Sequence, residues 1–434
     1  MRRLLATLLC CASLTSLPAT AASPNRAIAI GLPSDARATL DALVDDAIRA
    51  HDLPGGVLVV TSGEKVLYRK AYGVRTLEPH PVTNDPSTIY EFASMTKPMA
   101  TASAIMLLVQ RGVLRLGDKV ARWIPAYAQN GKQDVTIQEL LTQTSGMQID
   151  YTRADFQSDK ATILAHLDAT ALRFAPGTKF EYSDLAFITL ADVVTHAAGM
   201  PYERFVQDQI FRPLGMRDAF FDTTIDPTHA ARLAPQIRAQ TVQRLRDAYG
   251  TVPGLNGHAG MLATADDVAL LARAYLRAAR GEESRGFALT PATVRAMIEP
   301  HYVGNGAVRG LGWDLDSAYS RNRGEIFARG GFGHTGSSGT SVWIDPASDL
   351  AYVFATNAHY PDDHGTTLYL EAKLATVIAA NAEYRPDARN PIDAEEEQSA
   401  RFSADAARSA LGFPATPGPA PTPQPSASHG PLSP

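Results

Sequence analysis

The stretch Glu91-Phe92-Ala93-Ser94-Met95-Thr96-Lys97-Pro98-Met99 runs directly into an apolar segment, Ala100 to Val109. The apolar segment predicts a buried helix, with Ser94 at its amino-terminal end. A serine and a lysine three residues apart lie on one face of a helix, about one turn from each other. Free peptide N–H groups and the helix dipole favour negative charge at this end. The spacing therefore predicts a nucleophile, because a serine hydroxyl needs help to lose its proton and a desolvated lysine can give it.

The same Ser-x-x-Lys spacing occurs a second time, at Ser62-Gly63-Glu64-Lys65. This copy lies between Val57-Leu58-Val59-Val60 and Val66-Leu67-Tyr68, two runs that are typical of strands. Ser-Gly-Glu-Lys between two strands indicates the turn of a hairpin. Because Ser62 opens no helix, its lysine has no reason to share a face with it. We therefore expect Ser94, and not Ser62, to be the nucleophile.

The first residues have the three regions of a secretory signal peptide: Met1-Arg2-Arg3, the apolar run Leu4 to Leu17, and Pro18-Ala19-Thr20-Ala21-Ala22-Ser23. The apolar run is short for a membrane-spanning helix and contains Ser and Thr. We expect residues 1–22 to be removed, which places the mature protein in the periplasm or the medium. Both cysteines of the chain would leave with this segment, so no disulfide is expected afterwards.

Composition is that of an ordinary globular protein, with 45% hydrophobic and 20% charged residues in 434. The net charge of −5 points neither to nucleic acid nor to an anionic membrane surface. The histidines show no metal-ligand spacing such as His-Glu-x-x-His, and no Gly-x-Ser-x-Gly occurs. We therefore expect no metal or cofactor, and no α/β-hydrolase fold.

The order of the predicted elements indicates an α/β fold. A helix begins near Ser34, and residues 135–146 predict a short helix that ends at a glycine cap, Gly146. Strand character returns only late, at Ser341–Pro346 and Ala351–Ala355, before a last amphipathic helix with Leu370, Leu374, Val377 and Ile378. Strands at both ends of the chain imply one antiparallel sheet, built from both ends and flanked by helices, with a mainly helical lobe between them.

This reading makes residues 23–390 one folding unit, followed by a C-terminal extension over residues 391–434. From Pro414 the chain has eight prolines in its last 21 residues and few large apolar side chains. We expect the extension to be disordered from about residue 413.

Two further motifs follow Ser94-x-x-Lys97. They are Phe180-Glu181-Tyr182-Ser183-Asp184 and Gly333-His334-Thr335-Gly336-Ser337. In these motifs the chain resembles the class C β-lactamase-related serine hydrolases, which include penicillin-binding DD-peptidases, β-lactamases, esterases and D-amino-acid peptidases. Four further segments resemble family landmarks in the right order: Leu140–Gly146, Phe211–Met216, Gly257–Gly260 and Gly310–Trp313. The resemblance covers roughly residues 35 to 385, is most like a periplasmic penicillin-binding-protein branch, and implies a β-lactamase/transpeptidase-like fold.

The resemblance also implies roles for individual residues. Ser94 would be the acylated nucleophile, with Lys97 assisting the removal of its proton. Tyr182 would be the general base and then the acid for the leaving group, which requires that nearby cations lower the pKa of its phenol from about 10. The backbone N–H groups of Ser94 and Ser337 would form the oxyanion hole.

The remaining motif residues would contact substrate. Thr335 would offer its hydroxyl to a substrate carboxylate or carbonyl, and Gly336 would let the substrate lie close to the strand. Many relatives carry Lys where this chain has His334, and Asn where it has Asp184. His334 is only partly charged near neutral pH, and a carboxylate at Asp184 accepts hydrogen bonds but donates none. Both departures predict weak or no β-lactamase activity while acyl transfer is retained.

The predicted function is an exported serine hydrolase that acts through a Ser94 acyl-enzyme on D-Ala-D-Ala-type peptides or small esters. The expected partner is a small-molecule or peptidoglycan-peptide substrate, with no nucleic acid and no membrane span in the mature chain. The alternative is a non-catalytic penicillin-binding or sensing module that acylates without turnover. The sequence leaves open the natural acyl donor, the acceptor (water or an amine) and the oligomeric state.

Overall fold

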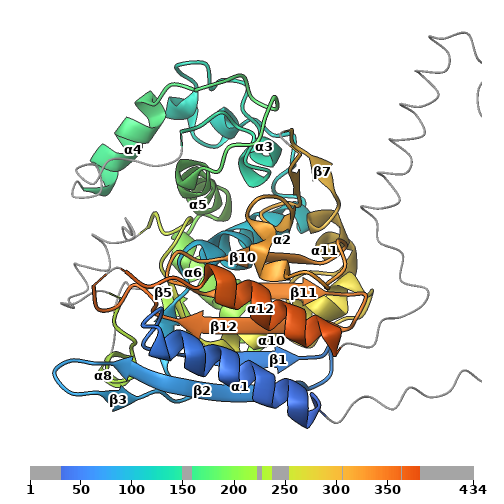
Figure 1. Cartoon of the computed structure of the whole chain (residues 1–434). Coiled ribbons are helices and arrows are strands. Elements are labelled where there is room, and N and C mark those ends of the chain that lie inside the picture. The colour runs from blue at the N-terminus through green and yellow to red at the C-terminus, as the bar shows by residue number, and fades with distance from the viewer. Residues whose placement is uncertain are drawn as a thin grey trace, which may run out of the picture.

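The computed structural model describes residues 31–148, 159–221, 227–236, 254–304, 306–362 and 364–381. The expected signal peptide and the C-terminal extension lie outside these residues. Figure 1 shows a sheet with helices on both faces and a helical lobe beside it.

Nine of the described strands form one sheet in the order β3-β2-β1-β12-β11-β10-β9-β8-β7. β1 pairs with both β2 and β12, and all the strand pairs recorded for this sheet are antiparallel. The two ends of the chain therefore meet in one sheet, as the sequence predicts. The strands are β1 (Gly55–Thr61), β2 (Val66–Thr76), β3 (Val82–Thr83), β7 (His301–Tyr302), β8 (Val308–Arg309), β9 (Asp314–Asp316), β10 (Phe332–Thr335), β11 (Ser341–Asp345) and β12 (Leu350–Thr356).

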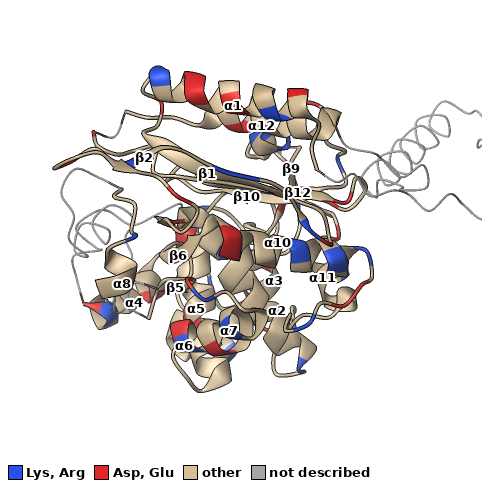
Figure 2. Cartoon of the chain, turned by 90° about the horizontal axis from the view of Figure 1, so that it is seen from below, with Lys and Arg blue, Asp and Glu red and all other residues tan. Residues whose placement is uncertain are grey.

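The central strand β1 is buried on both faces, so its side chains alternate between two apolar cores. Val57 and Val59 belong to the core shared with the helical lobe. Leu58 and Val60 belong to a smaller core beneath α1 (Ser34–Arg49) and α12 (Leu368–Ala380). Figure 2 shows these two helices on one side of the sheet and the other labelled helices on the opposite side, with most charged residues on the outside.

The helices between the sheet-forming ends make up the second layer and the lobe. None of the helices in the described part of the chain is long and apolar enough to cross a membrane. They are α2 (Ser103–Gln110), α3 (Ile137–Leu141), α4 (Lys160–Ala169), α5 (Asp184–Ala198), α6 (Tyr202–Val206), α7 (Arg212–Leu214), α8 (Pro227–Ala230), α10 (Ala265–Ala279) and α11 (Pro291–Met297).

Strand character does not return only late, and in this respect the sequence-based prediction is wrong. β7, β8 and β9 all precede residue 341, and a three-stranded sheet in the order β4-β6-β5 lies in the middle of the chain. Its strands are β4 (Ile89–Glu91), β5 (Phe220–Phe221) and β6 (Met261–Thr264). Strands of two to four residues are too short to show the alternation by which strands are recognised in a sequence.

The glycine cap predicted for the short helix α3 is also wrong. α3 ends at Leu141, and its signal lies at the other end, where Thr136 and Glu139 form a capping box. Gly146 has φ +80°, and a Cβ there would lie 2.3 Å from the carbonyl oxygen of Phe174. Glycine is therefore required for a left-handed turn against a neighbouring segment, five residues after the helix ends.

The segment from Ala93 to Gln110 is helical, but its type changes along its length. A 3₁₀ turn, η1 (Ala93–Met95), leads into a π-helical stretch, η2 (Lys97–Ala102), and then into α2. Pro98 lacks an N–H, and the Ser103 hydroxyl donates to the carbonyl oxygens of Pro98 (3.0 Å) and Met99 (2.7 Å). Single π-helical turns within helices often occur at functional sites.

Candidate active site

Ser94 lies in the 3₁₀ turn at the start of this helical segment, beside an unusual backbone conformation. The preceding residue, Ala93, has φ +44°, which is costly for a residue with a side chain. The Lys97 ammonium donates to the Ser94 hydroxyl, with 3.1 Å between Nζ and Oγ. The predicted serine–lysine pair is therefore a direct contact, held by a turn that stores strain.

Lys97 is fully buried, and oxygen atoms from distant parts of the chain surround its ammonium. Its Nζ lies 2.5 Å from Oδ1 of Asp184 and 2.9 Å from the carbonyl oxygen of His258. Burial by itself disfavours the charged form, but the negative charge of Asp184 and the contact with Tyr182 outweigh it, so the pKa of Lys97 is raised. Lys97 is therefore an ammonium in the resting site, not a free base.

Tyr182 precedes α5 and faces Lys97. Nζ of Lys97 lies 4.8 Å from the centre of the phenol ring, which is within cation–π distance. Burial raises the pKa of Tyr182; the Lys97 charge lowers it, but not enough to reverse the shift. A general base would need a lowered pKa, and the pKa of Tyr182 is not lowered in the resting site. Desolvation of the phenol is the larger effect, and Tyr182 is a neutral phenol there.

The start of α5 fixes the position of Asp184. The Ser183 hydroxyl accepts a hydrogen bond from the Ala186 N–H (3.1 Å), so Ser183 is the N-cap. Asp184 is then the first residue of the helix, where the helix dipole favours a carboxylate. Its side chain is 20% exposed, whereas that of Lys97 is 0% exposed.

The third motif lies at the end of β10. His334 and Thr335 are the last residues of that strand, and Ser337 follows in a turn, where it is exposed. A Cβ on Gly336 would lie 2.3 Å from the Thr340 hydroxyl and 2.5 Å from the Phe92 carbonyl oxygen. The glycine is therefore needed because the turn packs against the residues just before Ser94.

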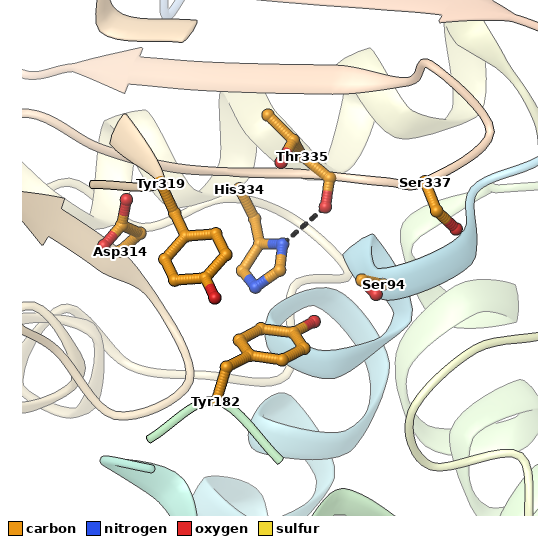
Figure 3. A pocket seen from close by; sticks show the side chains of 7 residues that line it. All are labelled: Ser94, Tyr182, Asp314, Tyr319, His334, Thr335 and Ser337. Atoms are coloured by element: carbon orange, nitrogen blue, oxygen red, sulfur yellow. Dashed lines mark hydrogen bonds between the residues drawn. The ribbon is translucent and has the colours of Figure 1, made fainter. Parts of the chain in front are cut away.

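A small pocket of about 180 Å³ opens between these motifs. Figure 3 shows how its side chains surround a common space. It is lined by Ser94, Tyr182, Asp314, Tyr319, His334, Thr335 and Ser337. Five of these seven residues belong to the three sequence motifs.

Tyr319 and Asp314 are the lining residues that sequence reasoning missed. The Tyr319 ring stacks on Tyr182 with 5.3 Å between centroids. Asp314 is 2% exposed and pairs with Arg309 at 2.6 Å, and Ser317 and Ser320 also donate to its carboxylate. Neither residue stands in a motif with catalytic chemistry, although Asp314 directly follows the Gly310–Trp313 landmark.

The landmark Gly257–Gly260 contributes through its backbone. The carbonyl oxygen of His258 accepts from Lys97, and that of Gly257 accepts from the Thr101 hydroxyl at 2.6 Å. The N–H of Gly260 donates to the Glu91 side chain at 2.9 Å. These bonds hold the loop against the helical segment that carries Ser94, a role that the sequence pattern did not reveal.

Comparison with known proteins identifies the family. The Beta-lactamase family matches residues 40–376, so the chain belongs to this family of serine hydrolases. An Escherichia coli (strain K12) protein named "Putative D-alanyl-D-alanine carboxypeptidase" is 27% identical over 343 residues, which cover 70% of this chain and 78% of that protein.

Solved structures show the same fold at lower identity. EstCE1, described as a hydrolase with promiscuous acyltransferase activity, has a TM-score of 0.66 and 21% identity, covering 79% of this chain and 98% of that one. The octameric penicillin-binding protein homologue from Pyrococcus abyssi has a TM-score of 0.63 and 21% identity, covering 83% and 80%. The β-lactamase/transpeptidase-like fold predicted from the sequence is confirmed.

Proposed function

We propose that this chain is an exported serine hydrolase that forms an acyl-enzyme at Ser94. Its substrates are D-Ala-D-Ala-type peptides or small esters, which makes it a carboxypeptidase or carboxylesterase with weak or no β-lactamase activity. The observation that carries the proposal is the buried Lys97 ammonium, which contacts both the Ser94 hydroxyl and the Asp184 carboxylate.

In the proposed reaction, the Ser94 oxygen attacks the acyl carbon and its proton passes to the Tyr182 phenolate. The backbone N–H groups of Ser94 and Ser337 stabilise the oxyanion, and one such donor is typically worth about 3–4 kcal/mol. Tyr182 then protonates the leaving group as the bond to the acyl carbon breaks. Water attacks the acyl-enzyme by the same route and restores Ser94.

The charges of the site support this division of roles. Asp184 keeps Lys97 protonated, so Lys97 cannot be the base; its charge instead favours the phenolate of Tyr182. Because burial raises the pKa of Tyr182, the phenolate is a minor species near neutral pH. The rate of acylation is therefore expected to rise with pH on the alkaline side.

The test compares a fluorescent penicillin, a chromogenic short-chain ester and a D-Ala-D-Ala peptide, each incubated with the purified protein. Turnover of the ester or the peptide, with a transient adduct on Ser94 seen by mass spectrometry, is the expected result. A stoichiometric adduct that never clears would instead show the sensing module. An adduct mapped to another serine would overturn the assignment.

Export rests on the pattern in residues 1–23. The proposal predicts a mature chain that starts at Ala22 or Ser23, with a net charge of −5 − 2 = −7 after Arg2 and Arg3 are lost. Intact-mass measurement of protein recovered from the periplasm or the medium tests this. Retention of residues 1–20 would show that the segment is an anchor.

A further inference from the structure

His334 lines the pocket, and one of its two ring nitrogens makes a hydrogen bond to the backbone. Its Nδ1 lies 2.7 Å from the carbonyl oxygen of Thr335, and because a carbonyl only accepts, Nδ1 carries a proton. The ring is 6% exposed. Burial, together with the positive charges of Arg309 and Lys97, lowers the pKa of His334 well below its usual value, so the imidazole is neutral.

In a neutral imidazole with the proton on Nδ1, the other nitrogen carries a lone pair. Figure 3 shows Nε2 pointing away from Thr335, into the space beside Tyr182. The two rings are 6.2 Å apart between centroids. The pocket therefore presents an acceptor where an ammonium would present a positive charge.

The charged side chain on the described wall of the pocket is negative. Of the seven described lining residues, Asp314 carries a carboxylate and none is Lys or Arg. Arg309 pairs with Asp314 and is only 1% exposed. The Nε and Nη2 atoms of Arg309 have no hydrogen-bond partner among the described residues. Arg309 is therefore the alternative to His334 as the group that binds the leaving group, and it would favour a carboxylate there. It does not line the pocket, and Asp314 occupies the wall in its place.

We propose that Nε2 of His334 accepts a hydrogen bond from an N–H or O–H group of the substrate's leaving group. The site then selects acyl donors with an uncharged donor, such as a carboxamide or a hydroxyl, next to the scissile bond. A carboxylate at this position would place its lone pairs against that of Nε2, with no proton between them, and both groups would lose their hydrogen bonds to water. This inference rests on the proposed acyl-enzyme chemistry and narrows the proposed substrates. Esters and peptides with an uncharged leaving group would be preferred over D-Ala-D-Ala-type peptides that end in a free carboxylate.

The test uses two pairs of acyl donors that differ at one group. In the peptide pair the leaving group is D-alaninamide or D-alanine, and in the ester pair it is D-lactamide or D-lactate. The expected result for the wild-type protein is a kcat/KM at least about tenfold higher for the carboxamide in at least one pair, a difference of about 1.4 kcal/mol. The carboxamide should also protect Ser94 better against a fluorophosphonate, which reports binding without turnover.

Two variants separate the acceptor from the charge. His334→Leu removes the lone pair without adding charge and should abolish the preference. His334→Lys supplies a cation and should reverse it toward the carboxylate. Melting temperatures establish that each variant folds, and the wild-type measurement stands even where one does not.

A wild-type preference for the carboxylate would overturn the inference and point to Arg309 as the anchor. Absence of discrimination in both pairs would overturn it as well. In either case Ser94 would still be labelled, so the proposed function would stand. Labelling of another serine would instead defeat the proposed function itself.

Discussion

The two Ser-x-x-Lys segments of this protein have the same spacing but different structures and different hydrogen-bond partners. At Ser62 the hydroxyl accepts the backbone N–H groups of Glu64 and Lys65, each at 3.2 Å, and the Ser62 N–H donates to the Lys65 carbonyl at 2.9 Å. This is the hairpin turn between β1 and β2 that the sequence predicts. At Ser94 the hydroxyl meets the lysine side chain instead.

The difference lies in burial and in long-range partners. The side chain of Lys65 is only half-buried at the surface of the hairpin, whereas that of Lys97 has no exposed area. A buried ammonium must be paired, and here Asp184 and the His258 carbonyl, both distant in sequence, satisfy it. The motif therefore becomes a candidate catalytic pair only where the fold surrounds its lysine.

The largest expected effect is the loss of activity when the Ser94 hydroxyl is removed, with removal of the Ser62 hydroxyl as the matched comparison. Ser94→Ala should abolish labelling by a fluorophosphonate or penicillin probe and lower ester hydrolysis by at least about 1,000-fold, because no other group forms the acyl-enzyme. Ser62→Ala should leave both unchanged. Activity-based labelling and peptide mapping measure this, and loss of labelling in Ser62→Ala alone would reverse the comparison.

The next effect tests the partner that only the Ser94 segment has. Tyr182→Phe should lower kcat/KM by at least about 100-fold, the lower end for a lost general base. Tyr319→Phe, on the ring stacked against it, is the matched control and should stay close to wild type. Steady-state kinetics with a chromogenic ester decide between them, and near-normal activity in Tyr182→Phe would exclude the proposed base.

A smaller effect concerns the charge beside Lys97. Asp184 raises the pKa of Lys97, so in Asp184→Asn only the contact with Tyr182 still opposes the effect of burial, and the ammonium loses its proton at lower pH. Since the phenolate of Tyr182 depends on that charge, the fall in rate at high pH, where Lys97 loses its proton, should begin at a lower pH. Ester hydrolysis should remain measurable, with a smaller loss than in Tyr182→Phe.

Profiles of kcat/KM against pH for the wild type and Asp184→Asn give the comparison, with melting curves as the control for folding. Acylation by penicillins should be followed in parallel, because the new amide can donate to a substrate carbonyl and improve it. An unchanged profile would mean that Asp184 does not set the charge of Lys97.

The smallest effect is on stability, at the hairpin. Ser62→Ala removes the acceptor of two backbone N–H groups and should lower the free energy of unfolding by about 0.5–1.5 kcal/mol, with activity intact. Urea denaturation of the wild type and the variant measures the loss. A large drop in activity without a change in stability would give the Ser62 segment a role that its geometry does not suggest.

Much of this architecture follows from local sequence patterns. Residues 57–60 and 66–68 have strand character, Ser34 begins a helix, and Leu370, Leu374 and Ile378 recur at helical spacing. These features predicted one sheet built from both ends of the chain, which β1 and β12 form. The three motifs likewise contain most of the residues that line the pocket, because their residue types are those that the proposed acyl transfer needs.

Tertiary structure decided what depends on distance and solvent. The sequence contains Lys97, Asp184 and Tyr182, but their protonation states follow from a 2.5 Å ion pair and from burial, which no spacing encodes. The same holds for His334, whose proton is fixed by a carbonyl at 2.7 Å, and for Tyr319, which only the fold brings against Tyr182. A pattern selects residue types, whereas charge and proton position depend on the low-dielectric surroundings that distant segments create.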